Sequence, residues 1–136
     1  MIYLAQPYTA EGRPDVVEAR WRIAMQVCAA MALRAEDVYS PIAHWHQIAV
    51  EHNLPSSAEF WWQHNLHVLD LCDGICILKL MGWERSKGLW IEVQHALNTG
   101  KKFYEVTNVK NGEFKLTDAH DIIESMKASR NEKGIK

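Results

Sequence analysis

Short runs rich in apolar residues alternate with longer stretches of helical character along this chain of 136 residues. Residues 2–5, 37–40, 74–80 and 102–106 are bounded by polar or turn-forming residues, which predicts a β-strand at each. The run at 74–80 is almost continuously apolar, a pattern typical of a strand buried on both faces. The pattern therefore predicts a sheet of four to five strands.

The stretches between these runs are expected to be helical, at 13–35, 58–71, 86–98 and 117–128. One face of the first helix repeats at three- and four-residue steps through Val17, Trp21, Ala24, Cys28, Met31 and Ala35. Ser86 is placed to cap the third helix, and Gly100 follows its end. Residues 41–57 contain histidines, prolines and serines, and they predict a long polar loop.

The alternation of strand and helix predicts an α/β fold, with a mostly parallel sheet and helices on both faces in three layers, flavodoxin-like or Rossmann-like. Its length fits one domain, expected over 1–129, with 130–136 as a flexible tail. Ligands of such sheets bind beyond the carboxyl ends of the strands. We therefore expect residues 6–9, 40–46 and 81–86 to converge on one cleft.

Charge and composition exclude several classes of partner. The chain has 15 basic and 17 acidic residues, so it lacks the electrostatic footprint expected for nucleic acid or an anionic membrane. It has neither an apolar run of membrane-spanning length nor the pattern of a signal peptide at its start. Cys28, Cys72 and Cys76 lie in apolar stretches and are expected to be buried free thiols. A cytoplasmic location is therefore expected.

The segment from Ser86 to Glu92 is the richest in chemistry. Ser86 stands where a helix begins, and the unpaired backbone N–H groups there favour an anion. Gly88 lies four residues before Glu92 on the same helix face, where a glycine leaves the carboxylate uncovered. A sugar phosphate then fits with its phosphate towards Ser86 and its anomeric carbon near Glu92, whose ionised form the helix dipole favours. The alternative is that Glu92 is a surface residue and Gly88 a packing glycine.

The pattern Ser-x-Gly-x-x-x-Glu after a buried strand resembles the nucleoside 2-deoxyribosyltransferase superfamily, which includes transferases and nucleoside 5′-monophosphate N-hydrolases. The resemblance covers most of residues 1–106, and Asp73 matches an acidic residue just before the third strand. It implies that Glu92 is the nucleophile, which forms a glycosyl-enzyme ester, and that Tyr3 orients it. It also implies a homodimer or a higher homo-oligomer.

The resemblance also indicates which substrate to expect. At the position of Ser86 the transferases have an aspartate and the monophosphate hydrolases a serine, and a serine at a helix start can bind a phosphate that an aspartate would repel. Asn65 stands where the family has an aspartate, and an amide cannot protonate a leaving base. Asp70 is then the candidate acid, with solvation of the helix end as its alternative role.

Further substrate contacts are expected from the loops that follow the strands. The candidates are Gln6, Tyr8, Thr9, His44, Asn65 and Trp83. Four tryptophans flank loops, which suggests a flat aromatic ligand; they are Trp45, Trp61, Trp62 and Trp83. A metal site beginning at His44 and His46 lacks ligands at a familiar spacing, so we expect no metal and no cofactor.

These observations favour an N-glycoside hydrolase that acts on a nucleoside 5′-monophosphate. A nucleoside 2-deoxyribosyltransferase that exchanges bases is the nearest alternative. The third alternative is a non-catalytic module that binds a nucleotide or ADP-ribose, and Asn65 is the residue that favours it.

Overall fold

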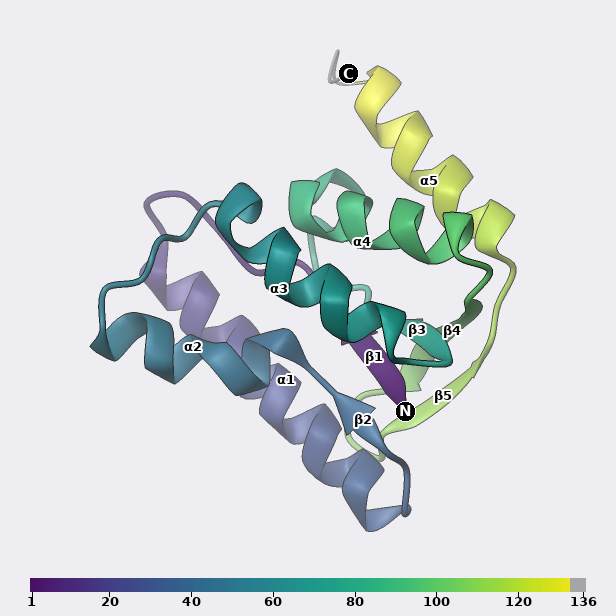
Figure 1. The fold of residues 1–136 in the computed structure, drawn as a ribbon, viewed down its shortest axis with the longest axis horizontal. Helices are drawn as coiled ribbons and strands as arrows, with labels where there is room; N and C mark the ends of the chain where they lie inside the picture. The colour runs from purple at the N-terminus through teal and green to yellow at the C-terminus, as the bar shows by residue number, and fades with distance from the viewer. Residues whose placement is uncertain (133–136) are drawn as a thin grey trace.

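The short apolar runs form the strands of a central sheet in the computed structural model, which describes residues 1–132 (Figure 1). The strands of this part of the chain are β1 (Ile2–Ala5), β2 (Val38–Tyr39), β3 (Gly74–Ile77), β4 (Lys102–Asn108) and β5 (Glu113–Leu116). Their order is β2-β1-β3-β4-β5; the first four are parallel, and β5 runs antiparallel to β4. The mostly parallel α/β fold predicted from the sequence is confirmed.

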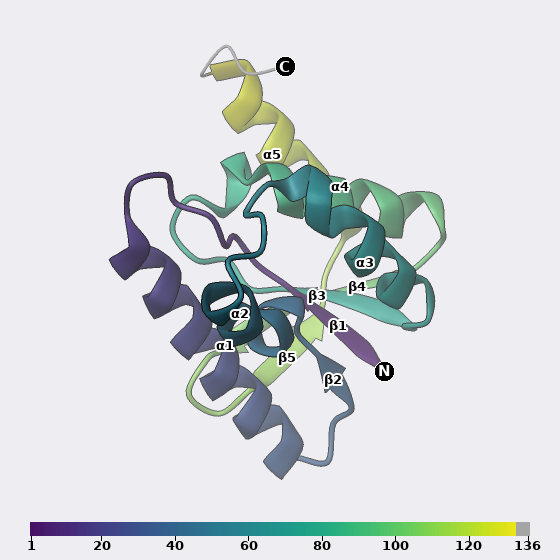
Figure 2. The same ribbon diagram turned by 60° about the vertical axis from the view of Figure 1, so that its left-hand side comes forward.

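Helices cover both faces of the sheet (Figures 1 and 2). The structure gives α1 (Pro14–Leu33), α2 (Pro41–Glu51), α3 (Ala58–Asp70), the 3₁₀ helix η1 (Trp83–Arg85), α4 (Lys87–Asn98) and α5 (Ala119–Glu132). On one face lie α3, α4 and α5; α1 covers the other, and α2 packs on α1. This is the three-layer arrangement that the alternating pattern predicts.

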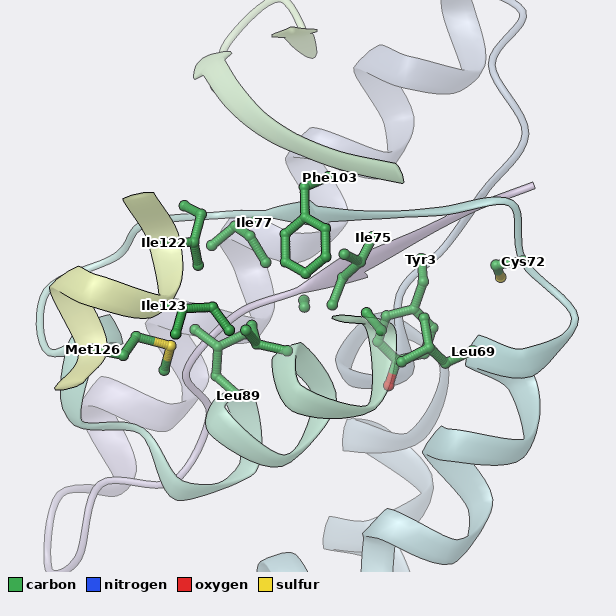
Figure 3. Close-up of a cluster of buried hydrophobic side chains, with 13 residues drawn as sticks. Tyr3, Leu69, Cys72, Ile75, Ile77, Leu89, Phe103, Ile122, Ile123 and Met126 are labelled. Carbon is green, nitrogen blue, oxygen red and sulfur yellow. The ribbon is translucent and has the colours of Figure 1, made fainter. Parts of the chain in front are cut away.

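Alternating strand side chains divide the core between the two faces of the sheet. Tyr3, Ile75 and Ile77 point towards α3, α4 and α5 (Figure 3). Leu4 and Cys76 point the other way, towards α1. The four residues of β3 are all buried, as the continuous apolar run predicts. The sheet therefore fixes β1 and β3 firmly at the centre of the molecule.

The largest error of the sequence-based prediction is at 41–57, where α2 replaces most of the expected loop. The Ala43 N–H group donates a hydrogen bond to Ser40 Oγ at 3.0 Å, so Ser40 caps the helix. Pro41 occupies the first helical turn, where its missing N–H group and fixed φ are tolerated. These two start signals outweigh the polar composition, and an irregular segment remains only at 52–57.

Several predicted boundaries are also corrected. The first helix ends at Leu33, because Ala35 has a φ of +61° and lies outside it. The expected domain limit at 129 is wrong, because α5 continues to Glu132 and Arg130 is buried. The rest of the predicted tail, 133–136, lies outside the described residues. Within residues 1–132, no helix is both long and apolar enough to cross a membrane.

Candidate active site

An open cleft with a volume of about 1210 Å³ lies beyond the carboxyl end of β1, beside the start of α4. The loop after β1 and the starts of α1, α3 and α4 line it, together with α2 and residues 53–57. In the strand order β2-β1-β3 the chain leaves β1 and β3 in opposite directions, and this switch point is where such folds bind ligands. The cleft lies where the sequence predicts one, with residues from 6–9 and 40–46 in its lining, but of the predicted segment 81–86 only Ser86 lines it.

A buried carboxyl group, Glu92, faces this cleft from the second turn of α4. Only 7% of the residue is exposed. The hydroxyl of Tyr3, which is fully buried on β1, donates a hydrogen bond to Glu92 Oε2. The sequence predicts this contact, and the structure confirms it. Glu92 is therefore held from the sheet side while it lines the cleft, and the alternative of a surface glutamate is wrong.

The surroundings of Glu92 disfavour its charge. Burial raises the pKa of Glu92 to about 7, although the hydrogen bond from Tyr3 lowers it in part. The expected preference for the ionised form is therefore wrong in sign, because burial outweighs the helix dipole in the second turn. Burial, followed by the nearby Glu92 charge, raises the pKa of Tyr3 well above its ordinary value, so Tyr3 remains a hydrogen-bond donor.

The start of α4 forms the wall next to Glu92. The Leu89 N–H group donates to Ser86 Oγ at 3.2 Å, so Ser86 caps the helix as predicted. Ser86 and Gly88 both line the cleft. A Cβ atom at Gly88 would meet no described atom within 4 Å. Gly88 is therefore not a packing glycine, and its missing side chain leaves open space beside the carboxyl group.

The loop after β1 brings Gln6, Tyr8 and Thr9 to the cleft, as predicted. Gln6 is only 4% exposed, and its Nε2 donates to the carbonyl oxygen of Arg20 at 3.0 Å, which fixes the orientation of the amide. Its Oε1 is buried without a hydrogen-bond partner among the described residues, and so is Oδ1 of Asn65, another cleft residue. A ligand bearing N–H or O–H groups would satisfy these two acceptors.

Arg20 fastens two edges of the site together. Its guanidinium donates to the carbonyl oxygens of Tyr8 at 3.3 Å, Thr9 at 2.9 Å and Met81 at 2.9 Å. The loop after β1 is thereby tied to the turn after β3. The guanidinium of Arg20 is engaged in these backbone hydrogen bonds, and Arg20 does not line the cleft.

The cleft histidine is His46, and the prediction of His44 is wrong. On the helix α2, the side chains of His44 and His46 point about 200° apart, so only one of them can face the cleft. The predicted loop gave no such constraint. Burial lowers the pKa of His46, and its Nδ1 lies 2.5 Å from the Tyr8 hydroxyl oxygen, within hydrogen-bond distance. His44 lines a second, smaller cavity of about 510 Å³, together with His64 and His67.

Two other predicted residues lie away from the cleft. Asp70 is exposed at the end of α3, where its Oδ1 lies 2.5 Å from Nε2 of His95, so the structure does not support its acid role. Trp83 packs against the core, and the Lys79 ammonium lies 5.2 Å from the centre of its ring. Asp73, which matches an acidic residue of the resembled family, is exposed and binds the N-terminal ammonium at 2.9 Å.

Three of the four loop-flanking tryptophans do line the cleft: Trp45, Trp61 and Trp62. The rings of Trp45 and Trp61 lie 5.3 Å apart between centres, and Trp61 Nε1 donates to the carbonyl oxygen of Pro55 at 2.7 Å. The sequence analysis missed Lys87, a cleft residue that forms an ion pair with Glu59. Its place next to the helix cap was a signal that could have identified it.

The part of the chain covered by the structure, 1–132, contains no group of three His, Cys, Asp or Glu side chains placed to hold a metal ion. The strand order and the cleft at the switch point define a flavodoxin-like α/β domain with a buried carboxyl group in its ligand site.

The chain belongs to a protein family described as a domain of unknown function (DUF1937), which matches residues 1–108. The match includes β1 to β4 and the lining residues of the cleft, whereas β5 and α5 follow it. No curated protein matches the sequence.

Proposed function

We propose that this protein is an N-glycoside hydrolase that cleaves the base–sugar bond of a nucleoside 5′-monophosphate. The observation that carries the proposal is the Tyr3–Glu92 pair, which faces a cleft left open by Gly88. The resemblance of Tyr3, Ser86, Gly88 and Glu92 to the nucleoside 2-deoxyribosyltransferase superfamily supports the same chemistry.

In this mechanism the Glu92 carboxylate attacks the anomeric carbon of the sugar. The C–N bond breaks, its electron pair leaves with the base, and a glycosyl ester of Glu92 forms. Water then attacks the same carbon, gives up a proton, and releases Glu92, so the configuration is retained after two inversions. Tyr3 orients the carboxylate, and because Asn65 has no acidic proton, the departing base takes its proton from water.

The phosphate fits at the start of α4. Ser86 Oγ already accepts the Leu89 N–H group, which leaves the first N–H groups of the helix, at Lys87 and Gly88, for an anion. Lys87 lines the cleft, and the ion pair of its ammonium group with Glu59 is exposed. An exposed pair of this kind contributes only about 0–1 kcal/mol, so a phosphate can displace it.

The test is a chromatographic screen of ribo- and deoxyribonucleoside 5′-monophosphates for released base. The wild type is expected to release base, and Glu92→Gln to lose about 10³-fold or more of that activity while still binding the nucleotide in calorimetry. Glu11→Gln makes the same chemical change on an exposed cleft residue and should remain active. Undiminished base release by Glu92→Gln, or none by the wild type with any of these nucleotides, would refute the proposal.

A binding module is the second candidate, because the cleft lacks the expected acid: position 65 carries an amide, and Asp70, the predicted acid, does not line the cleft. A thermal shift with nucleotides, without base release after long incubation, would favour it. A transferase would instead show exchanged nucleotide when free base is supplied in excess.

The proposal also includes a cellular location and an oligomeric state. We place the protein in the cytoplasm, because Cys28, Cys72 and Cys76 are free thiols. We also propose a homodimer or larger homo-oligomer, since Phe60 and Trp62 on α3 are 36% and 39% exposed. Light scattering behind size-exclusion chromatography measures the mass, and a monomer at micromolar concentration would contradict this part.

A further inference from the structure

An arginine from α5 lies buried behind the start of α4. Arg130 is 8% exposed; its Nη1 donates to the Glu84 carbonyl oxygen at 2.7 Å and its Nη2 to the Ser86 carbonyl oxygen at 3.3 Å. The guanidinium also lies 4.7 Å from the ring centre of Trp90. Arg130 follows the region that matches the family, so it belongs to the extension of this chain beyond residue 108.

Ser86 is the residue on which these contacts converge. Its carbonyl oxygen accepts from Arg130 and also from the Trp90 N–H group at 3.0 Å, the first backbone hydrogen bond of α4. Its hydroxyl accepts from the Leu89 N–H group. The junction between η1 and α4 is therefore fixed at the carbonyl and hydroxyl groups of the capping residue.

The electrostatics of this contact are unusual. A helix start carries a positive partial charge, and a cation beside it is unfavourable unless hydrogen bonds to the cation offset the repulsion. Among residues 1–131, whose side chains the structure describes, the ion pairs of the protein do not include Arg130. Two carbonyl oxygens and an aromatic ring hold the guanidinium, so its positive charge lies beside the start of α4 without an ion-pair partner among these residues.

We propose that Arg130 is a positioning residue for the phosphate end of the candidate active site. It holds the Ser86 carbonyl so that the first N–H groups of α4 keep one orientation, and its charge adds to the potential that a phosphate meets there. This inference rests on the proposed function. Arg130 itself does not line the cleft, so it acts through the backbone and the electric field rather than by touching the substrate.

The anchoring of α5 makes this role separable from folding. Ile122, Ile123 and Met126 hold α5 against the core, close to Leu89 of α4 (Figure 3). Arg130 lies one turn beyond Met126 on the same face of α5. Substitution of Arg130 therefore leaves the apolar contacts of the helix in place.

The first experiment compares kcat/KM for a nucleoside 5′-monophosphate with kcat/KM for the corresponding nucleoside. In Arg130→Gln the value for the monophosphate should fall about 10- to 100-fold, mainly through KM, while the value for the nucleoside changes little. Arg130→Lys should retain part of the phosphate preference, and added methylguanidinium should restore part of it in Arg130→Ala. An equal loss for both substrates, or no loss, overturns the inference.

The second experiment does not depend on activity. Hydrogen exchange of the Leu89 and Trp90 amides should be at least about 10-fold faster in Arg130→Gln, with β3 unchanged, because these two amides bond to Ser86. Lys127→Gln removes an exposed cation one turn earlier on α5 and should leave the exchange unchanged. Unchanged exchange at Leu89 and Trp90 in Arg130→Gln overturns the inference even in an active enzyme. A wild type without base release refutes the proposed function, whereas the exchange data still report on Arg130.

Discussion

Glu92 meets two opposed requirements in a single side chain. The proposed mechanism needs Glu92 as an ionised nucleophile, yet burial raises the pKa of this carboxyl group to about 7. The hydrogen bond from Tyr3 is the contact that partly restores the charged form. At neutral pH both protonation states are therefore populated, which makes the group sensitive to small changes around it.

The first prediction concerns the pH dependence of base release. In the proposed mechanism the ionised form of Glu92 is the active one, so kcat/KM should rise with pH through about 7 and then level off. Tyr3→Phe removes the hydrogen bond that lowers the pKa of Glu92, so the rising limb should move to higher pH and kcat/KM at pH 7 should fall about 10-fold. Rate profiles between pH 5 and pH 9 measure both effects, and a limb that stays in place would contradict the role of Tyr3.

The second prediction concerns stability. The folded-state pKa of Glu92, about 7, lies above its ordinary value of 4.5, so the wild type is most stable below pH 4.5 in this respect and loses stability as the pH rises to 7. Glu92→Gln escapes this loss and should be more stable at pH 8, by on the order of 3 kcal/mol, and nearly equal to the wild type at pH 4. Urea unfolding at the two pH values measures the difference. A variant less stable at pH 8 would show that the carboxylate supports the fold.

At the scale of elements, the glycine at the start of α4 makes this helix less stable but leaves space in the cleft. A helix with an alanine at an interior position is more stable than one with a glycine there by about 0.5–1 kcal/mol, and a Cβ atom at position 88 would enter open space. We predict that Gly88→Ala melts at a higher temperature than the wild type yet releases base at least about 10-fold more slowly, because the methyl group occupies the sugar site. Gln94→Ala, an exposed change on the same helix, should leave the activity intact. Calorimetry and the base-release assay together decide this point.

The elements differ in how far the sequence determines them. β3 and α4 are predicted correctly because a buried strand and a capped amphipathic helix each have a strong local pattern. α2 is missed because its helix-start signals, Ser40 and Pro41, are embedded in a polar composition that also suits a loop. β5 is missed although it forms a local hairpin with β4 and Asn111-Gly112 is a hairpin-turn signal, because Glu113–Leu116 is a strand of only four residues with little apolar content.

The residues of the candidate site also differ in how well they could be predicted from the sequence. The Tyr3–Glu92 contact is implied by the resemblance to the nucleoside 2-deoxyribosyltransferase superfamily, and the structure contains it between β1 and α4. The direction of a side chain cannot be predicted when its secondary structure is assigned wrongly. Because the sequence predicts a loop in place of α2, it indicates His44 as the cleft residue, whereas His46 lines the cleft. Asp70 follows the cleft residue Asn65 by only five positions in the sequence, but it lies at the end of α3, where its carboxylate contacts His95 instead of the cleft.

At the scale of the whole molecule, the family-matched region and the folded unit are not the same. The match ends at residue 108, whereas Ile122, Ile123 and Met126 of α5 are buried in the same core cluster as Tyr3. Each of these three side chains contributes roughly 2 kcal/mol by burial, a sum comparable with the total stability of about 5–15 kcal/mol expected for a domain.

We predict that a chain ending at residue 108 does not fold on its own. Circular dichroism during heating should show no cooperative transition, whereas the full chain should show one. A truncated chain that melts near the temperature of the full-length protein would mean that α5 is dispensable for the core.

The three carbonyl contacts of Arg20 bear on how a ligand gains access. Because they join the loop after β1 to the turn after β3, this rim of the cleft is preorganised before any molecule arrives. We expect any backbone movement during ligand entry to occur instead at residues 52–57, including Asn53, which form the exposed link between α2 and α3.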